Sequence, residues 1–147
     1  MENVPLAENE NQRRRLTALV DQISDADLTR DAGPGWTVSM RLAYMAFWDS
    51  WAEHLVRRWR AGEMPPPTMP SWYDDAVTET LLGQWRALPP RAAARLAIEA
   101  AEAVDAEIAH TETPVVMAIT AAHEGHLIHR HQHRSECLDR IDEALDD

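Results

Sequence analysis

The stretch that decides the fold is W-T-V-S-M-R-L-A-Y-M-A-F-W-D-S-W-A-E-H-L-V-R-R-W-R, residues 36–60. Thr37 is a typical N-cap residue, and the sequence predicts one long helix from there to about Arg60. On a helical projection the apolar residues of this stretch fall within about 140°, which defines an inward face. That face consists of Val38, Leu42, Met45, Trp48, Ala52, Leu55, Val56 and Trp59.

Two polar residues share the inward face. Tyr44 lies at its edge, where a tyrosine usually packs its ring and keeps its hydroxyl in water. Asp49 lies between Met45 and Ala52, and burying an unpaired carboxylate there would be costly. Asp49 is therefore either a functional group or a residue at a frayed rim of the core.

The rest of the chain predicts three more main helices and a crossover. Helical spacing of apolar residues indicates helices over residues 8–23, 91–110 and about 127–145. Residues 62–70 hold four prolines, which impose an extended crossing. After it, Ser71 or Asp74 is expected to cap a shorter helical segment that ends before Pro89. We expect one all-α domain over residues 1–147, a four-helix bundle with a long proline-rich crossover.

The stretch H-E-G-H-L-I-H-R-H-Q-H-R-S-E-C, residues 123–137, leads into the predicted last helix and holds five of the seven histidines and the only cysteine. Gly125 disfavours a helix that reaches back to His123. Spacings of 3, 4 and 4 would place His126, His129, His133 and Cys137 on one helical face. Such a face is either a metal chelate or a solvated polar surface. A weaker alternative is pH or metal sensing by the clustered imidazoles, which are His123, His126, His129 and His131.

Arg134 does not fit the pattern of the predicted last helix, because it falls in the apolar stripe that faces the core. The stripe otherwise consists of Leu127, Leu138, Ile141 and Leu145.

The composition limits the classes of partner that this chain is expected to bind. The net charge is −11 and the chain has no lysine, so nucleic acid, which needs clustered cations, is not an expected partner. No apolar run approaches the roughly 20 residues that a membrane span needs, and the acidic N-terminus does not resemble a signal peptide. We expect a cytoplasmic protein that binds a small molecule, a metal or a second copy of itself.

Three blocks resemble the DinB-like family, which includes the N-terminal domains of mycothiol-dependent maleylpyruvate isomerases. Trp36-Thr37-Val38 with residues 42–49 is similar to its W-T-V…L-A-H-L-A-F-W-D signature. Residues 88–92 and 99–105 resemble its middle section, and residues 133–141 resemble its H-R-R-E-H-L-x-x-I ending. The resemblance covers roughly residues 10–145. It implies a four-helix bundle, often dimeric, that holds a divalent metal with three histidines and activates a low-molecular-weight thiol.

The family's three histidine positions correspond to Tyr44, His133 and Cys137 in this chain. Cysteine is a good zinc ligand, whereas tyrosine is a poor one at neutral pH because its phenol titrates near 10. His129 and Asp49 are candidate substitutes. His129, His133 and Cys137 span two helical turns, too far to close on one ion, so at most two of them can act together with a group from another helix.

Two functions follow from this comparison. The first is a metal-dependent thiol transferase or isomerase that holds zinc or nickel and uses Tyr44 as a catalytic hydrogen-bond donor. Because two triad positions differ, we favour the second, a homodimeric bundle with a degenerate metal site and low metal occupancy. Such a protein would serve as a small-ligand or interaction module.

Overall fold

The structure is a computed structural model that describes residues 4–63 and 70–146. In chain order its elements are α1 (Leu6–Gln22), α2 (Asp25–Leu28), α3 (Val38–Arg60), α4 (Ser71–Ala87), α5 (Pro90–Ala109), α6 (Thr113–Ala121), the 3₁₀-helix η1 (Gly125–Leu127) and α7 (Arg130–Asp146). The described residues form no β-strand, and their one isolated β-bridge joins Asp31 to Thr37. The prediction of an all-α protein is therefore confirmed.

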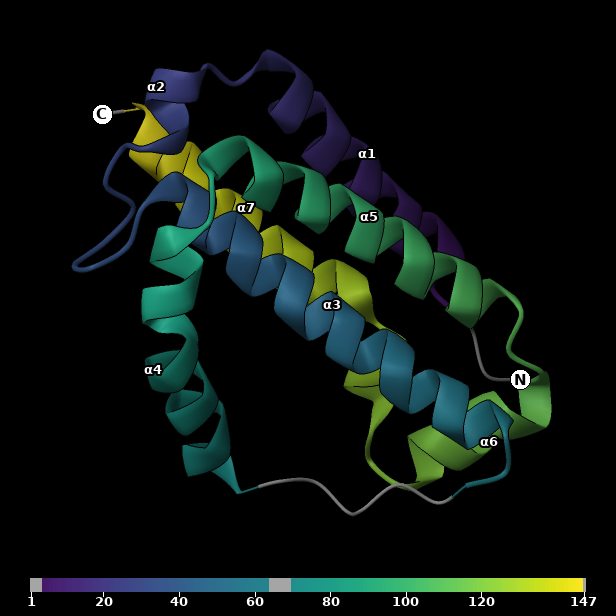
Figure 1. Cartoon of the computed structure of the whole chain (residues 1–147). Helices are drawn as coiled ribbons and strands as arrows, with labels where there is room; N and C mark the ends of the chain where they lie inside the picture. The colour runs from purple at the N-terminus through teal and green to yellow at the C-terminus, as the bar shows by residue number, and fades with distance from the viewer. Residues whose placement is uncertain (1–3, 64–69, 147) are drawn as a thin grey trace.

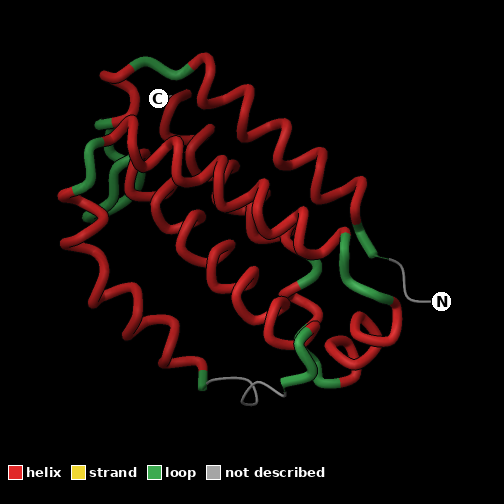
Figure 2. Tube along the Cα trace, turned by 45° about the vertical axis from the view of Figure 1, so that its right-hand side comes forward, coloured by secondary structure: helices red, strands yellow, loops and turns green. Residues whose placement is uncertain are grey.

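Four long helices pack together (Figure 1). Helix α5 contacts α1 and α3, and α7 contacts the same two helices from the other side, so the contacts close into a ring. Helices α1 and α7 run toward the end of the molecule where α2 lies, and α3 and α5 run away from it. Helix α4 contacts α3 and stands at an angle to the ring, and loops join the helices throughout (Figure 2). No helix in the described part of the chain is long and apolar enough to cross a membrane.

Helix α3 follows the prediction closely. It begins directly after Thr37, whose Oγ1 accepts a hydrogen bond from the Met40 amide at 3.3 Å. It ends at Arg60, as expected. Five residues of the predicted inward face are buried, and Trp48, Leu55 and Trp59 are only partly buried. The buried five are Val38, Leu42, Met45, Ala52 and Val56.

The segment after the crossover differs from the prediction in its cap. Helix α4 begins at Ser71 itself, with Pro70 as its N-cap residue and no capping side-chain hydrogen bond. Proline in extended conformation sets the start of this helix, so neither Ser71 nor Asp74 serves as the predicted cap. Most of the predicted proline-rich crossing, residues 64–69, lies outside the described residues.

The last helix begins three residues later than predicted. After α6, His123 adopts a positive φ of 61° and residues 125–127 form the 3₁₀-helix η1, so α7 begins only at Arg130. Asn9 of α1 fixes this start, because its Oδ1 accepts the His131 amide at 2.8 Å and its Nδ2 donates to the Ile128 carbonyl. His126 and His129 therefore precede α7, and the predicted common helical face with His133 and Cys137 does not form.

Arg134, the charged residue in the apolar stripe, lies at the centre of the four helices and is 0% exposed. Its Nε donates to Asp49 Oδ2 of α3 at 3.1 Å. Its Nη1 donates to the Asn9 carbonyl of α1 and to Asp105 Oδ2 of α5, each at 3.0 Å. Its Nη2 donates to Asp105 Oδ1 at 2.8 Å and to the Ala101 carbonyl at 3.3 Å. Every N–H of the guanidinium group therefore has an acceptor, as a buried cation requires.

Two more arginines complete this buried ion network. Arg130, one turn before Arg134, donates its Nε to Asp49 Oδ1 at 2.8 Å. Arg13 of α1 donates its Nη1 to Asp105 Oδ2 at 2.9 Å from a partly exposed position. Asp49, which the sequence marked as either functional or at a frayed rim, is 0% exposed and bridges two guanidinium groups.

Removing the Asp49 charge should be severely destabilising. In an Asp49→Asn protein, Arg130 would lose its only carboxylate among the described residues and Arg134 would lose one of two. We expect the free energy of unfolding, measured by urea denaturation, to fall by roughly 3–5 kcal/mol. Asp139→Asn is the control, because Asp139 pairs with Arg15 on the surface and should cost less than about 1 kcal/mol. Equal losses in the two variants would contradict the central role of the network.

Candidate functional site

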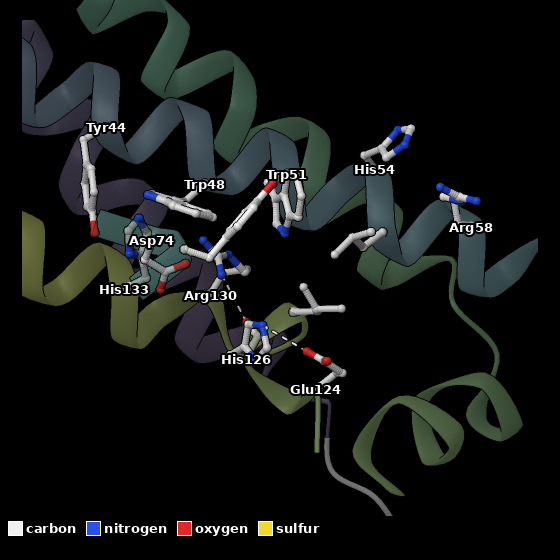
Figure 3. Close-up of a pocket in the computed structure, with 13 residues that line it drawn as sticks. Tyr44, Trp48, Trp51, His54, Arg58, Asp74, Glu124, His126, Arg130 and His133 are labelled. Atoms are coloured by element: carbon white, nitrogen blue, oxygen red, sulfur yellow. Dashed lines mark hydrogen bonds and ion pairs between the residues drawn. The ribbon is translucent and has the colours of Figure 1, made fainter. Parts of the chain in front are cut away.

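A pocket of about 550 Å³ lies between α3, α4, the η1 segment and the start of α7. Figure 3 shows the side chains that line it. Aromatic residues from α3 and α4 form much of its wall, and charged and imidazole groups are placed among them. The lining residues are Tyr44, Trp48, Trp51, His54, Leu55, Arg58, Tyr73, Asp74, Glu124, His126, Leu127, Arg130 and His133.

The inner end of the pocket joins α3 to α7. The rings of Tyr44 and His133 lie 5.4 Å apart between centroids, and those of Tyr44 and Trp48 lie 6.4 Å apart at a steep angle. Tyr44 also packs edge-on against Trp36 and Trp85, at 5.8 Å each. These ring contacts fix the position of Tyr44, because one side of it faces the aromatic cluster and the other faces His133.

Burial determines the protonation states of His133 and Tyr44 at the inner end of the pocket. Desolvation, with the nearby positive charge of Arg130, lowers the pKa of His133 to about 4. Desolvation also raises the pKa of Tyr44, and the neighbouring Cys137 and Asp74 add to the effect. At neutral pH His133 is therefore a neutral imidazole and Tyr44 a neutral phenol, so both groups can offer hydrogen bonds to a ligand without carrying charge.

The ion network presents one arginine to this pocket. Arg130 is 5% exposed; its Nε is bound to Asp49 and its Nη1 donates to the His126 carbonyl at 3.1 Å. Its Nη2 is buried and has no hydrogen-bond partner in the described part of the chain. The indole Nε1 of Trp48 and Nε2 of His133 are buried and unpartnered among the same residues. Such groups are costly to bury unpaired, so their presence on pocket-lining residues is a functional signal.

Acidic side chains also line the pocket. Glu124 Oε2 lies 3.3 Å from His126 Nε2, and Asp74 of α4 also lines the cavity. Arg58 is at the open rim, where its Nε donates to Glu63 at 2.8 Å. In Figure 3, His54 and Arg58 lie far along α3 from Tyr44. The pocket is thus polar at both ends and aromatic between them.

Of the predicted site residues, Tyr44 and His133 are the two that line this pocket, where their rings face each other. Asp49 lies behind the pocket, with both oxygens engaged by arginines. Cys137 is buried in the apolar cluster of the bundle, and burial raises the pKa of its thiol to about 12. His129 precedes α7 and lies against His131, with ring centroids 5.8 Å apart.

These positions do not fit the metal centre that the resemblance implies. Within the described ranges, no three His, Cys, Asp or Glu side chains gather closely enough to hold a metal ion. Asp49 already has two arginine partners, whereas an aspartate that binds a metal needs a free carboxylate. The Cys137 thiol stays protonated, whereas a cysteine that binds a metal does so as a thiolate.

Sequence reasoning missed two residues that give this pocket its character, Arg130 and Tyr73. Arg130 could have been found, because it is one turn from Arg134 and both could reach a carboxylate on the inward face of α3. Tyr73 could not, because its place on the pocket wall depends on how α4 packs against α3.

Comparison of the chain with models of protein families, with curated proteins and with solved structures found no match.

The buried His133 imidazole should make stability depend on pH. Its pKa is about 4 in the folded protein against an ordinary 6.5, so below pH 6.5 the unfolded chain binds a proton that the folded protein does not. Folding stability should then fall with decreasing pH by at most about 1.4 kcal/mol per pH unit from this group. Urea denaturation at pH 7, 6 and 5 should show a flatter dependence for His133→Gln than for wild type.

The exposed His123 provides the control for this measurement. A His123→Gln protein should keep the wild-type pH dependence. If His133→Gln and wild type lose stability equally between pH 7 and 5, His133 is not a buried neutral group.

Proposed function

We propose that this protein is a DinB-like four-helix bundle whose metal site is degenerate and which serves as a small-ligand-binding module. The observation that carries the proposal is the aromatic pocket between α3, α4 and α7, with buried polar atoms of Trp48, Arg130 and His133 lacking partners among the described residues. The W-T-V block and the ring of contacts among four helices support the family assignment.

The size and lining of the pocket favour a small organic ligand. Ligand pockets usually measure about 300–1,000 Å³ and combine apolar walls with a few polar groups that fix orientation. This pocket has a volume of about 550 Å³. Four aromatic side chains, Tyr44, Trp48, Trp51 and Tyr73, offer flat surfaces for a planar or apolar body.

A ligand screen with matched tryptophan variants tests this function. Small aromatic and aliphatic compounds would be screened by ligand-observed NMR, and the affinity of each hit measured by calorimetry. Trp51→Ala removes a wall of the pocket and should weaken the hits roughly tenfold. Trp72→Ala is the control, because Trp72 is 64% exposed and does not line the pocket. The proposal fails if no compound binds, or if both variants bind the hits equally.

One observation favours a second candidate, a metal-dependent thiol transferase or isomerase. The neutral His133 imidazole has a buried Nε2 with no partner in the described chain and lies against Tyr44, so it offers one ligand to zinc or nickel. The other donors do not converge on it.

Metal analysis separates the two candidates. Protein purified without a histidine tag after zinc or nickel supplementation should contain less than about a tenth of an equivalent, because one imidazole binds weakly alone. A full equivalent that is lost in His133→Ala would instead support the metal-dependent function.

A further inference from the structure

Two obligate hydrogen-bond donors lie unused at the inner end of the pocket. The Trp48 indole N–H and the Nη2 of Arg130 can only donate, and both are buried without an acceptor in the described residues. His133 adds Nε2, which donates in one tautomer of the neutral ring. All three belong to residues that line the same cavity, where Figure 3 shows them grouped near Tyr44. A ligand group that satisfies them must be rich in acceptor oxygens.

The net charge of the buried ion network indicates the sign of the charge that the ligand group should carry. Asp49 and Asp105 are the two carboxylates of the network, and three arginines donate to them. Glu10 lies 3.9 Å from the outermost, Arg13, and is shared there with Arg14 on the surface. The network therefore carries more arginines than carboxylates.

Arg130 is the arginine of this network that faces the cavity. It is 5% exposed, so solvent screens its charge poorly. An anion at its Nη2 would offset the excess positive charge.

Two acidic residues also line the pocket. Glu124 is paired with His126, and Asp74, from α4, is near enough to Tyr44 and His126 to affect the pKa of both. Neither carboxylate accepts a hydrogen bond from Arg130 Nη2, the Trp48 indole N–H or His133 Nε2.

We propose that the pocket binds a small organic carboxylate, with its two oxygens on Arg130 Nη2 and Trp48 Nε1 beside His133. Its apolar body would lie against Trp51, Tyr73 and Leu127, which also line the cavity. The inference rests on the proposed ligand-binding function and specifies its ligand class. Arg130 is prepared for this role because Asp49 and the His126 carbonyl hold its other two nitrogens in place, so little conformational entropy is lost on binding.

Three ligands that differ only in their head group test the proposal. Benzoate, benzamide and benzylamine would be titrated into the full-length protein at pH 7 and low salt by calorimetry. Benzoate should bind at least about tenfold more tightly than benzamide, because hydrogen bonds to a charged acceptor are stronger than neutral ones. Benzylamine should bind most weakly, because it places a second cation beside Arg130.

Variants that remove single donors locate the carboxylate. Trp48→Phe keeps a ring but loses the N–H, and should weaken benzoate about fivefold while changing benzamide less. Arg130→Lys keeps the charge but loses Nη2, and should weaken benzoate by about tenfold. Arg57→Lys makes the same exchange on the exposed surface of α3, outside the pocket, and should leave benzoate affinity unchanged within about twofold. If Arg130→Lys does not fold, Trp48→Phe alone decides the question.

The outcomes distinguish a failure of the carboxylate assignment from a failure of the proposed ligand-binding function. If benzamide or benzylamine binds as tightly as benzoate and competes with hits that need Trp51, the pocket binds ligands but the carboxylate assignment is wrong. An undiminished benzoate affinity in Trp48→Phe also overturns the assignment. If none of the three compounds binds, the carboxylate assignment falls, and the Trp51-dependent screen decides the ligand-binding function separately.

Discussion

The arrangement of the helices depends on the burial of the Arg134 guanidinium group between them. A cation removed from water must satisfy all of its N–H donors inside the protein. The acceptors come from α1, α3 and α5, so the group is satisfied only when α7 meets all three at once. A buried ion network adds little net stability over an apolar core of the same shape. We infer that its main effect is to specify which helices are neighbours and in what register.

The same network constrains the pocket. Arg130 and Arg134 are one helical turn apart, so both reach the single carboxylate of Asp49. With its Nε on Asp49 and its Nη1 on a carbonyl, Arg130 keeps Nη2 for the cavity. The core and the site therefore share Asp49, and a substitution there would change the packing of four helices and the donor that faces the pocket together.

Local signals predicted the helices well, and contacts between distant residues explain what they missed. The Thr37 cap and the periodicity of residues 38–60 gave α3 correctly because both are properties of one short segment. The start of α7 was misplaced because Asn9, 122 residues away in sequence, accepts the His131 amide there. Arg134 looked like an error in an apolar stripe because its partners lie on three other helices. Tyr44 and His133, two positions of the triad that the resemblance implies, do lie against each other, whereas the walls of the pocket depend on how α4 packs against α3.

The electrostatic environment of the three positions that the resemblance implies as metal ligands does not suit a cation. A divalent ion between α3 and α7 would lie beside Arg130 and Arg134, and repulsion between like charges in a poorly solvated interior is strong. Asp49 cannot offset that repulsion, because its oxygens already accept from both arginines. Tyr44, and Cys137 with its pKa raised to about 12 by burial, add no negative charge at neutral pH. The interior that disfavours a metal cation is therefore also the interior that favours an anionic oxygen ligand.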